Sequence, residues 1–207
     1  MRIASLFAAL GMLAALATST LAAVKEQMPW YVYRDHRHPD NHGTWQSVQA
    51  PGSSAAIILD DAAASAEGAS HVRLEFTLRP PLGWAGVVVL PYPDAWGIEP
   101  GFAYDLSTAG HLAFKARGAN GGEKIRVKAA VAGDQPFGDS APLPFDSGWL
   151  TLSDQWQSFE LEVDGGRLSR VITPLVVISS YPQNPVGRAI VHLDHIRYET
   201  GPAARLK

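Results

Sequence analysis

The sequence predicts an all-β fold, specifically a two-sheet antiparallel β-sandwich. Three observations support this prediction. Short apolar runs alternate with polar residues at a period of two, clusters of Gly, Pro, Asn and Asp separate the runs, and one run is apolar on both sides. Two stacked antiparallel sheets accommodate both kinds of strand, because each sheet buries one face against the other. The 19 Gly, 15 Pro and 6 Trp form a turn-rich, aromatic-rich set that also favours a sheet protein.

Ten strands are expected in the chain. In residues 71–78 the apolar side chains Val72, Leu74 and Phe76 share one face, and charged side chains occupy the other. Residues 86–90 are apolar throughout and predict a central strand covered on both sides. In the last run the apolar parity changes near Asp194, so either both faces are buried or a bulge lies there. The expected strands are residues 30–33, 55–59, 71–78, 86–90, 111–116, 124–130, 149–152, 158–163, 175–179 and 189–198.

The N-terminal residues 1–23 have the order of a secretory signal peptide. A basic start is followed by the apolar run 3–16 and then by small residues. The alternative is a membrane anchor, but the run is shorter than the roughly 20 residues that a spanning helix needs, and no Lys or Arg cluster follows it. We therefore expect a secreted or periplasmic protein in which residues 24–207 form a single domain.

Cysteine content and charge limit the sources of stability and the partners. The chain has no Cys, so packing or a bound ion must supply what a disulfide cannot. The formal net charge is -3 and the basic residues are scattered singly. We therefore expect neither nucleic acid nor membrane insertion.

The segment 91–105 carries the residue types that bind sugars. An aromatic ring stacks on the apolar face of a sugar, and planar polar side chains bind its hydroxyl groups. Tyr92, Trp96 and Tyr104 are the stacking candidates here, and Asp94 is a polar candidate. The alternative is that these rings fill the end of the sandwich beneath the loop.

Further ligand-binding candidates lie on later strands and turns. Arg126 and Lys128 project from one face of a strand and could donate hydrogen bonds to sugar hydroxyls, or they could be two solvated charges. The remaining aromatic candidates are Trp149, Trp156 and Tyr181. Trp84, at the start of the most apolar strand, is expected to pack in the core instead.

Two segments raise the question of metal binding. His36, His38 and His42 lie within a short run, but no fourth ligand is near in sequence, which favours a polar loop. Asp194 lies where the last strand changes parity, and its carboxylate could be one ligand of a structural calcium ion. The alternative is that Asp194 accepts a hydrogen bond from a neighbouring backbone amide.

The sequence contains none of the catalytic motifs G-x-S-x-G and H-E-x-x-H, and no phosphate-binding glycine loop. Glu160 and Glu162 share a strand face, which an alternating charged face explains, whereas glycoside hydrolysis needs two carboxyl groups placed across a bound sugar. We therefore expect that the protein is not an enzyme and requires no cofactor, with a structural calcium ion as the one candidate.

From Tyr104 onward the order of motifs is similar to that of the galactose-binding-domain-like jelly rolls, which include carbohydrate-binding modules of secreted bacterial proteins. The resemblance implies a jelly-roll β-sandwich with a sugar-binding site and a calcium site that uses Asp194. His195 stands where relatives often have a second Asp. The motifs that carry the resemblance are residues 104–107, 111–118, 121–125, 137–140, 149–157 and 190–198.

Three functions follow from these observations. The first is non-catalytic binding of a polysaccharide or glycoconjugate, with a polysaccharide-processing enzyme as a further partner. The second is a structural or adhesive protein-interaction module of the cell envelope. The third is a small polysaccharide lyase or glycoside hydrolase on the same fold.

Overall fold

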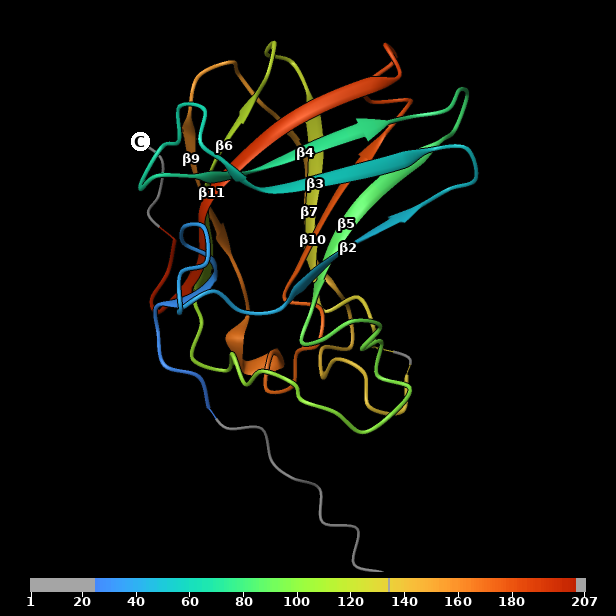
Figure 1. Cartoon of the computed structure of the whole chain (residues 1–207). Coiled ribbons are helices and arrows are strands. Elements are labelled where there is room, and N and C mark those ends of the chain that lie inside the picture. Colours follow the sequence, from blue (N-terminus) through green and yellow to red (C-terminus); the bar gives the residue numbers. More distant parts are fainter. Residues whose placement is uncertain (1–24, 134, 204–207) are drawn as a thin grey trace, which may run out of the picture.

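A computed structural model describes residues 25–133 and 135–203, and the predicted signal peptide 1–23 lies outside this part of the chain. The described residues form two antiparallel β-sheets stacked on each other (Figure 1). This confirms the predicted all-β sandwich. In the described part of the chain, no helix is long and apolar enough to span a membrane.

The larger sheet has six strands in the order β3-β4-β11-β6-β9, and β1 also pairs with β11. Every pairing in it is antiparallel. Its strands are β1 (Trp30–Tyr33), β3 (Ser54–Asp61), β4 (His71–Thr77), β6 (His111–Gly118), β9 (Gln157–Glu162) and β11 (Arg188–Glu199).

The second sheet has five strands in the order β2-β5-β10-β7-β8. Its strands are β2 (Thr44–Gln49), β5 (Trp84–Leu90), β7 (Lys124–Ala129), β8 (Phe145–Thr151) and β10 (Leu175–Ser180), and a short 3-10 helix, η1 (Gly165–Arg167), precedes β10. All ten predicted strands are present. The sequence prediction missed β2, an edge strand whose residues are mostly polar and therefore lack the apolar alternation that marks the others.

The core lies between the two sheets. Val72, Leu74 and Phe76 of β4 are buried there together with alternate residues of β5, such as Val87 and Val89. A smaller apolar cluster lies on the opposite, outer side of the five-stranded sheet and contains Val88, Leu90, Ala95 and Val176. Strand β5 is therefore covered on both faces, as the apolar run predicted.

Strand β11 contains the bulge that the change of parity indicated. Its register with β6 shifts between Asp194 and Arg197, and His195 has a φ of 51°. Val191 before the bulge and Ile196 after it both point into the core. The bulge therefore keeps both halves of the strand packed inward.

The long connections 91–110 and 130–144, the latter without residue 134, lie together at one end of the sandwich (Figure 1). The amide of Phe137 donates a hydrogen bond to the carbonyl of Gly97 at 2.8 Å. Gly97 has a φ of 79°, and a Cβ there would lie 2.8 Å from the Cα of Gly138, so only glycine fits this approach. The two connections thus pack on each other directly.

Candidate functional site

The outer side of the five-stranded sheet gathers several of the predicted ligand-binding residues. Arg126 pairs with Trp149 on one side and with Ile178 on the other, so the three side chains lie in one row. They point away from the core because their strand neighbours Val127 and Val177 point into it. Arg126 lies over the ring of Trp149, with its Cζ 6.0 Å from the ring centroid. We call this surface the outer aromatic face. It comprises Gln46, Trp84, Asp94, Trp96, Arg126, Lys128, Asp146 and Trp149.

A carboxylate on this face holds the two predicted basic residues. Asp146 accepts a hydrogen bond from Nε of Arg126 at 2.6 Å and lies 3.2 Å from Nζ of Lys128. Burial acts to raise the pKa of Asp146, but the hydrogen bonds from Arg126, Gly148 and Lys128 outweigh it and lower the pKa to about 2. The three side chains are therefore fixed in place with one net positive charge.

Trp96 reaches the same face from the loop that follows β5. It packs, partly exposed, against the small cluster that includes Val88 and Val176. Asp94 is tied to β2, because its amide donates to Oε1 of Gln46 at 3.3 Å while Nε2 of Gln46 donates to Oδ1 of Asp94 at 3.2 Å. These contacts hold the loop against β2, and Trp96 packs on the same small cluster as Ile178 of the row.

The position of Trp84 differs from the sequence prediction. It was expected in the core, but it is 39% exposed. Its neighbour Ala85 points into the core, so Trp84 points to the outer side, as do Gly86 and Val88. The parity of β5 could have shown this, since Trp84 lies three residues before Val87 and therefore on the opposite face. Gln46 and Asp146 were also missed, because neither is distinctive without knowledge of its partners.

Three predicted residues lie away from this face. The ring of Tyr104 lies 4.6 Å from that of Trp30 and 5.9 Å from that of His42, and burial raises its pKa to about 12. Tyr104 therefore fills the end of the sandwich, which was the alternative interpretation. Tyr181 packs against the core, and Trp156 lies on the outer side of the other sheet. Tyr92 is 38% exposed and lies against Gly101.

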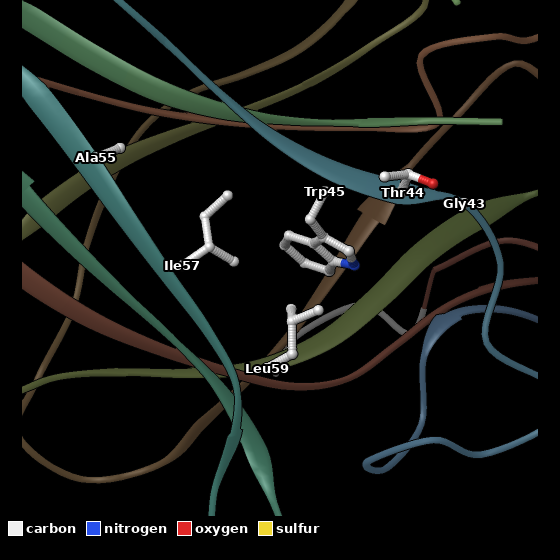
Figure 2. Close-up of a pocket in the computed structure, with 6 residues that line it drawn as sticks. All are labelled: Gly43, Thr44, Trp45, Ala55, Ile57 and Leu59. Atoms are coloured by element: carbon white, nitrogen blue, oxygen red, sulfur yellow. The ribbon is translucent and has the colours of Figure 1, made fainter. Parts of the chain in front are cut away.

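A second candidate site is an apolar depression of about 540 Å³ between the edge strands β2 and β3 (Figure 2). The ring of Trp45 faces the side chains of Ile57 and Leu59 across it. The other lining residues are Gly43, Thr44 and Ala55. This lining contains one hydroxyl group and no charge, so it lacks the planar polar groups that a sugar ligand needs.

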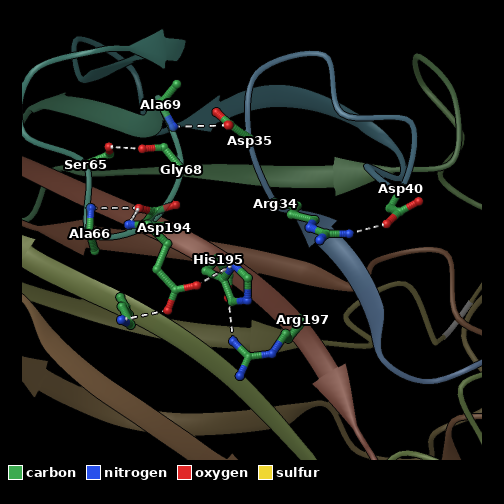
Figure 3. A network of polar contacts seen from close by, with 12 residues as sticks. Arg34, Asp35, Asp40, Ser65, Ala66, Gly68, Ala69, Asp194, His195 and Arg197 are labelled. Carbon is green, nitrogen blue, oxygen red and sulfur yellow. Dashed lines mark hydrogen bonds and ion pairs between the residues drawn. The ribbon is translucent and has the colours of Figure 1, made fainter.

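Asp194 is fully buried and holds the loop 62–69 over the six-stranded sheet (Figure 3). Its Oδ2 accepts hydrogen bonds from the amides of Ala66 and Glu67, both at 2.9 Å. Burial raises the pKa of this carboxyl group, although the backbone amides act to lower it. Asp194 therefore accepts hydrogen bonds from backbone amides of this loop, and calcium binding by the same side chain is a separate prediction.

The donors around Asp194 fit a calcium ion poorly. Amide hydrogens surround Oδ2 where a cation would require oxygen ligands, and Glu67 is held by Lys115 and His195. Oδ1 is buried without a hydrogen-bond partner. Calcium at Asp194 therefore stays a prediction that depends on this one atom.

The three histidines of the N-terminal run point to different partners. Nε2 of His36 lies 3.9 Å from Asp60, Nδ1 of His38 accepts a hydrogen bond from the amide of Asp40, and His42 stacks on Trp30. These residues do not converge on a common point.

The sequence of this chain has limited similarity to known protein sequences. No family model matches the chain. A curated relative, a formate-dependent phosphoribosylglycinamide formyltransferase from Thioalkalivibrio sulfidiphilus, is 35% identical over 104 residues, which are 49% of this chain. The match spans only 24% of that relative's length.

Solved structures resemble this protein over most of its length. A family 30 carbohydrate-binding module of a cellulosomal cellulase from Clostridium thermocellum has a TM-score of 0.54 at 16% identity, covering 84% of this chain and 98% of that chain. A family 11 module from the same organism, in complex with a β-1,3-1,4-mixed-linked tetrasaccharide, has a TM-score of 0.52 at 12% identity and covers 77% and 91%. The chain therefore has the β-sandwich fold of carbohydrate-binding modules, as its motifs indicated.

Proposed function

We propose that this protein binds a polysaccharide without modifying it, through the outer aromatic face. The observation that carries the proposal is the row of Trp149, Arg126 and Ile178, with Trp84 and Trp96 beside it on one side of one sheet. The rings supply stacking surfaces, and the fixed charged groups supply hydrogen bonds to hydroxyl groups. The rest of the fold serves to hold this face rigid.

The dimensions of the face favour an oligomeric ligand. From β5 to β8 there are three strand spacings, which is roughly 14 Å. Trp84 lies on the first of these strands and Trp149 on the last. A chain of several sugars could contact both ends, whereas a monosaccharide could not. The tetrasaccharide bound by the family 11 module supports a ligand of this class.

The electrostatics of the face favour binding over catalysis. Glycoside hydrolysis needs a carboxyl group that is protonated near neutral pH beside a second carboxylate. Asp146 instead has a pKa of about 2, because Arg126 and Lys128 stabilise its charge. It therefore suits a fixed hydrogen-bond acceptor and not a general acid.

Affinity electrophoresis against a panel of soluble polysaccharides tests the proposal. We expect at least one polysaccharide to retard the wild-type protein, and Trp149→Ala to reduce its affinity by about 30-fold, the effect of losing an aromatic contact of about 2 kcal/mol. Trp156→Ala is the matched control, because this Trp lies on the other sheet and should leave retardation unchanged.

Three results would contradict the proposal. Retardation by no polysaccharide would favour a protein-interaction module, and new reducing ends or unsaturated products would establish a hydrolase or lyase. Retardation lost in Trp156→Ala but kept in Trp149→Ala would move the site to the other sheet.

The proposal also includes export directed by residues 1–23 and action beside a polysaccharide-processing enzyme.

A further inference from the structure

A buried polar cluster lies on the outer side of the six-stranded sheet, remote from the outer aromatic face. Among residues 25–133 and 135–203, one group of three His, Asp or Glu side chains has ligand atoms within 4.8 Å of one another: Asp61, His71 and His192. They come from the adjacent strands β3, β4 and β11. His71 is 0% exposed and His192 is 6% exposed, which is unusual for two polar rings in contact.

Two imidazole nitrogens and one carboxylate oxygen converge in this cluster. Nε2 of His71 lies 2.7 Å from Nδ1 of His192 and 3.7 Å from Oδ2 of Asp61. Burial lowers the pKa of both rings, so each is neutral at neutral pH and has a lone pair on one nitrogen. Nδ1 of His71, on the side of the ring away from His192 and Asp61, is buried without a partner, so the convergence of the other three atoms is the observation that carries the site.

We propose that Asp61, His71 and His192 form a binding site for a divalent transition metal ion such as zinc. Imidazole nitrogen with one carboxylate oxygen is a ligand set that zinc prefers, whereas calcium requires six to eight oxygen ligands. Three protein ligands leave one position of a tetrahedral site for water. Asp61 is the most exposed of the three side chains and provides the route of entry.

The distances require only a small adjustment. Two nitrogens bound to one zinc ion at about 2.1 Å in a tetrahedral site lie roughly 3.4 Å apart. The rings of His71 and His192 would therefore separate by about 0.7 Å from their present 2.7 Å. The hydrogen now shared between them moves to the far nitrogen of its own ring, so the imidazoles stay neutral.

The neighbouring charged residues would still have partners if Asp61 bound a metal ion. Arg73 lies 3.7 Å from Asp61 but also pairs with Glu75, so it keeps a carboxylate partner. Arg117 lies over the ring of Trp156 at 5.3 Å. The ring of Trp156 in turn makes a T-shaped contact with His71, with ring centroids 5.4 Å apart, and covers the site. In a chain without Cys, an ion here would cross-link three strands of one sheet.

Isothermal titration of the chelator-treated protein with zinc chloride tests this site. We expect one zinc ion per chain and a higher midpoint of thermal unfolding. Asp61→Asn and His192→Gln should each weaken binding at least tenfold. Asp61→Asn keeps the side-chain acceptor for the amide of Ala63 and so guards against a loss of folding. His38→Gln, in the exposed N-terminal loop, is the matched control and should bind as the wild type does.

Long-range ¹H–¹⁵N spectra of the histidine rings give an independent readout. Zinc should shift the ring nitrogens of His71 and His192 and leave those of His38 and His111 unchanged. Stoichiometric binding that survives both cluster substitutions, or shifts confined to His36 and His38, would overturn the proposal. Failure to bind zinc would also overturn it, with no consequence for glycan binding on the opposite sheet.

Discussion

The two outer faces of the sandwich carry similar residue types but differ in burial. On the five-stranded sheet, Arg126, Lys128 and Asp146 lie beside partly exposed tryptophans and are open to solvent. On the six-stranded sheet, the loop 62–69 and Trp156 cover His71 and His192, and the amide groups of that loop satisfy Asp194. The polar groups of the first face are thus available to a polysaccharide, and those of the second lie beneath the loop 62–69 and Trp156.

The two faces therefore differ less in residue composition than in whether a loop covers their side chains. Trp96 and Trp156 both reach a sheet from a loop, yet their contacts differ. Trp96 packs on an apolar cluster, whereas Nε1 of Trp156 donates to the carbonyl of Ala64 at 2.9 Å and so closes the loop over the sheet. Each prediction below changes one side of this comparison.

The largest expected effect is on the covered face. Asp194→Ala would leave the amides of Ala66 and Glu67 without their acceptor, and we expect the free energy of unfolding to fall by about 3 kcal/mol. Urea denaturation measures this loss. Asp194→Asn retains one carbonyl oxygen and should lose less. Equal stability of Asp194→Ala and the wild type would show that the loop is not held by this carboxylate.

The same variant tests the calcium prediction. If calcium uses Oδ1 of Asp194, added calcium raises the unfolding midpoint of the wild-type protein and a chelator lowers it, because the ion binds the folded state. Asp194→Ala should then show no response to calcium. An identical response in both proteins would place the ion elsewhere, and no response in either would exclude calcium at this position.

On the open face, Trp84→Ala should reduce glycan affinity about tenfold, which is 1.4 kcal/mol. Its stability should fall by about 1 to 2 kcal/mol, since more than half of the side-chain surface is buried. Affinity electrophoresis against the polysaccharide found to bind the wild type measures the first quantity, and urea denaturation measures the second. Unchanged affinity would show that Trp84 does not contact the ligand. The proposed ligand would then contact only the row from Trp149 to Ile178 and would be shorter.

Much of the fold could be predicted from the sequence because burial leaves a periodic pattern. The alternation in β4, the apolar run of β5 and the parity change at Asp194 correspond to real strands and a real bulge. Strand β2 has no such pattern, because an edge strand needs few buried side chains.

The site was less predictable because it depends on pairs that are distant in sequence. Arg126 and Lys128 were found from their parity, but Asp146, which fixes them, lies some twenty residues away on β8. Tyr104 is an aromatic residue of the kind that binds sugars, but its ring packs against Trp30 instead. His71 and His192 meet only because β4 and β11 are neighbours in the sheet.

The smallest expected effect concerns the charge of Asp146. Its pKa in the folded protein, about 2, lies below its ordinary value of 3.8, so its contribution to stability is complete above about pH 4 and is lost as the pH falls toward 2. We expect Asp146→Asn to be less stable than the wild type by about 1 kcal/mol at pH 7, and the difference to shrink between pH 4 and pH 2. Urea denaturation at pH 7, 4 and 2.5 measures it, with Asp40→Asn as the control for an exposed ion pair. A difference that is the same at every pH would mean that Asp146 stabilises the face by shape and not by charge.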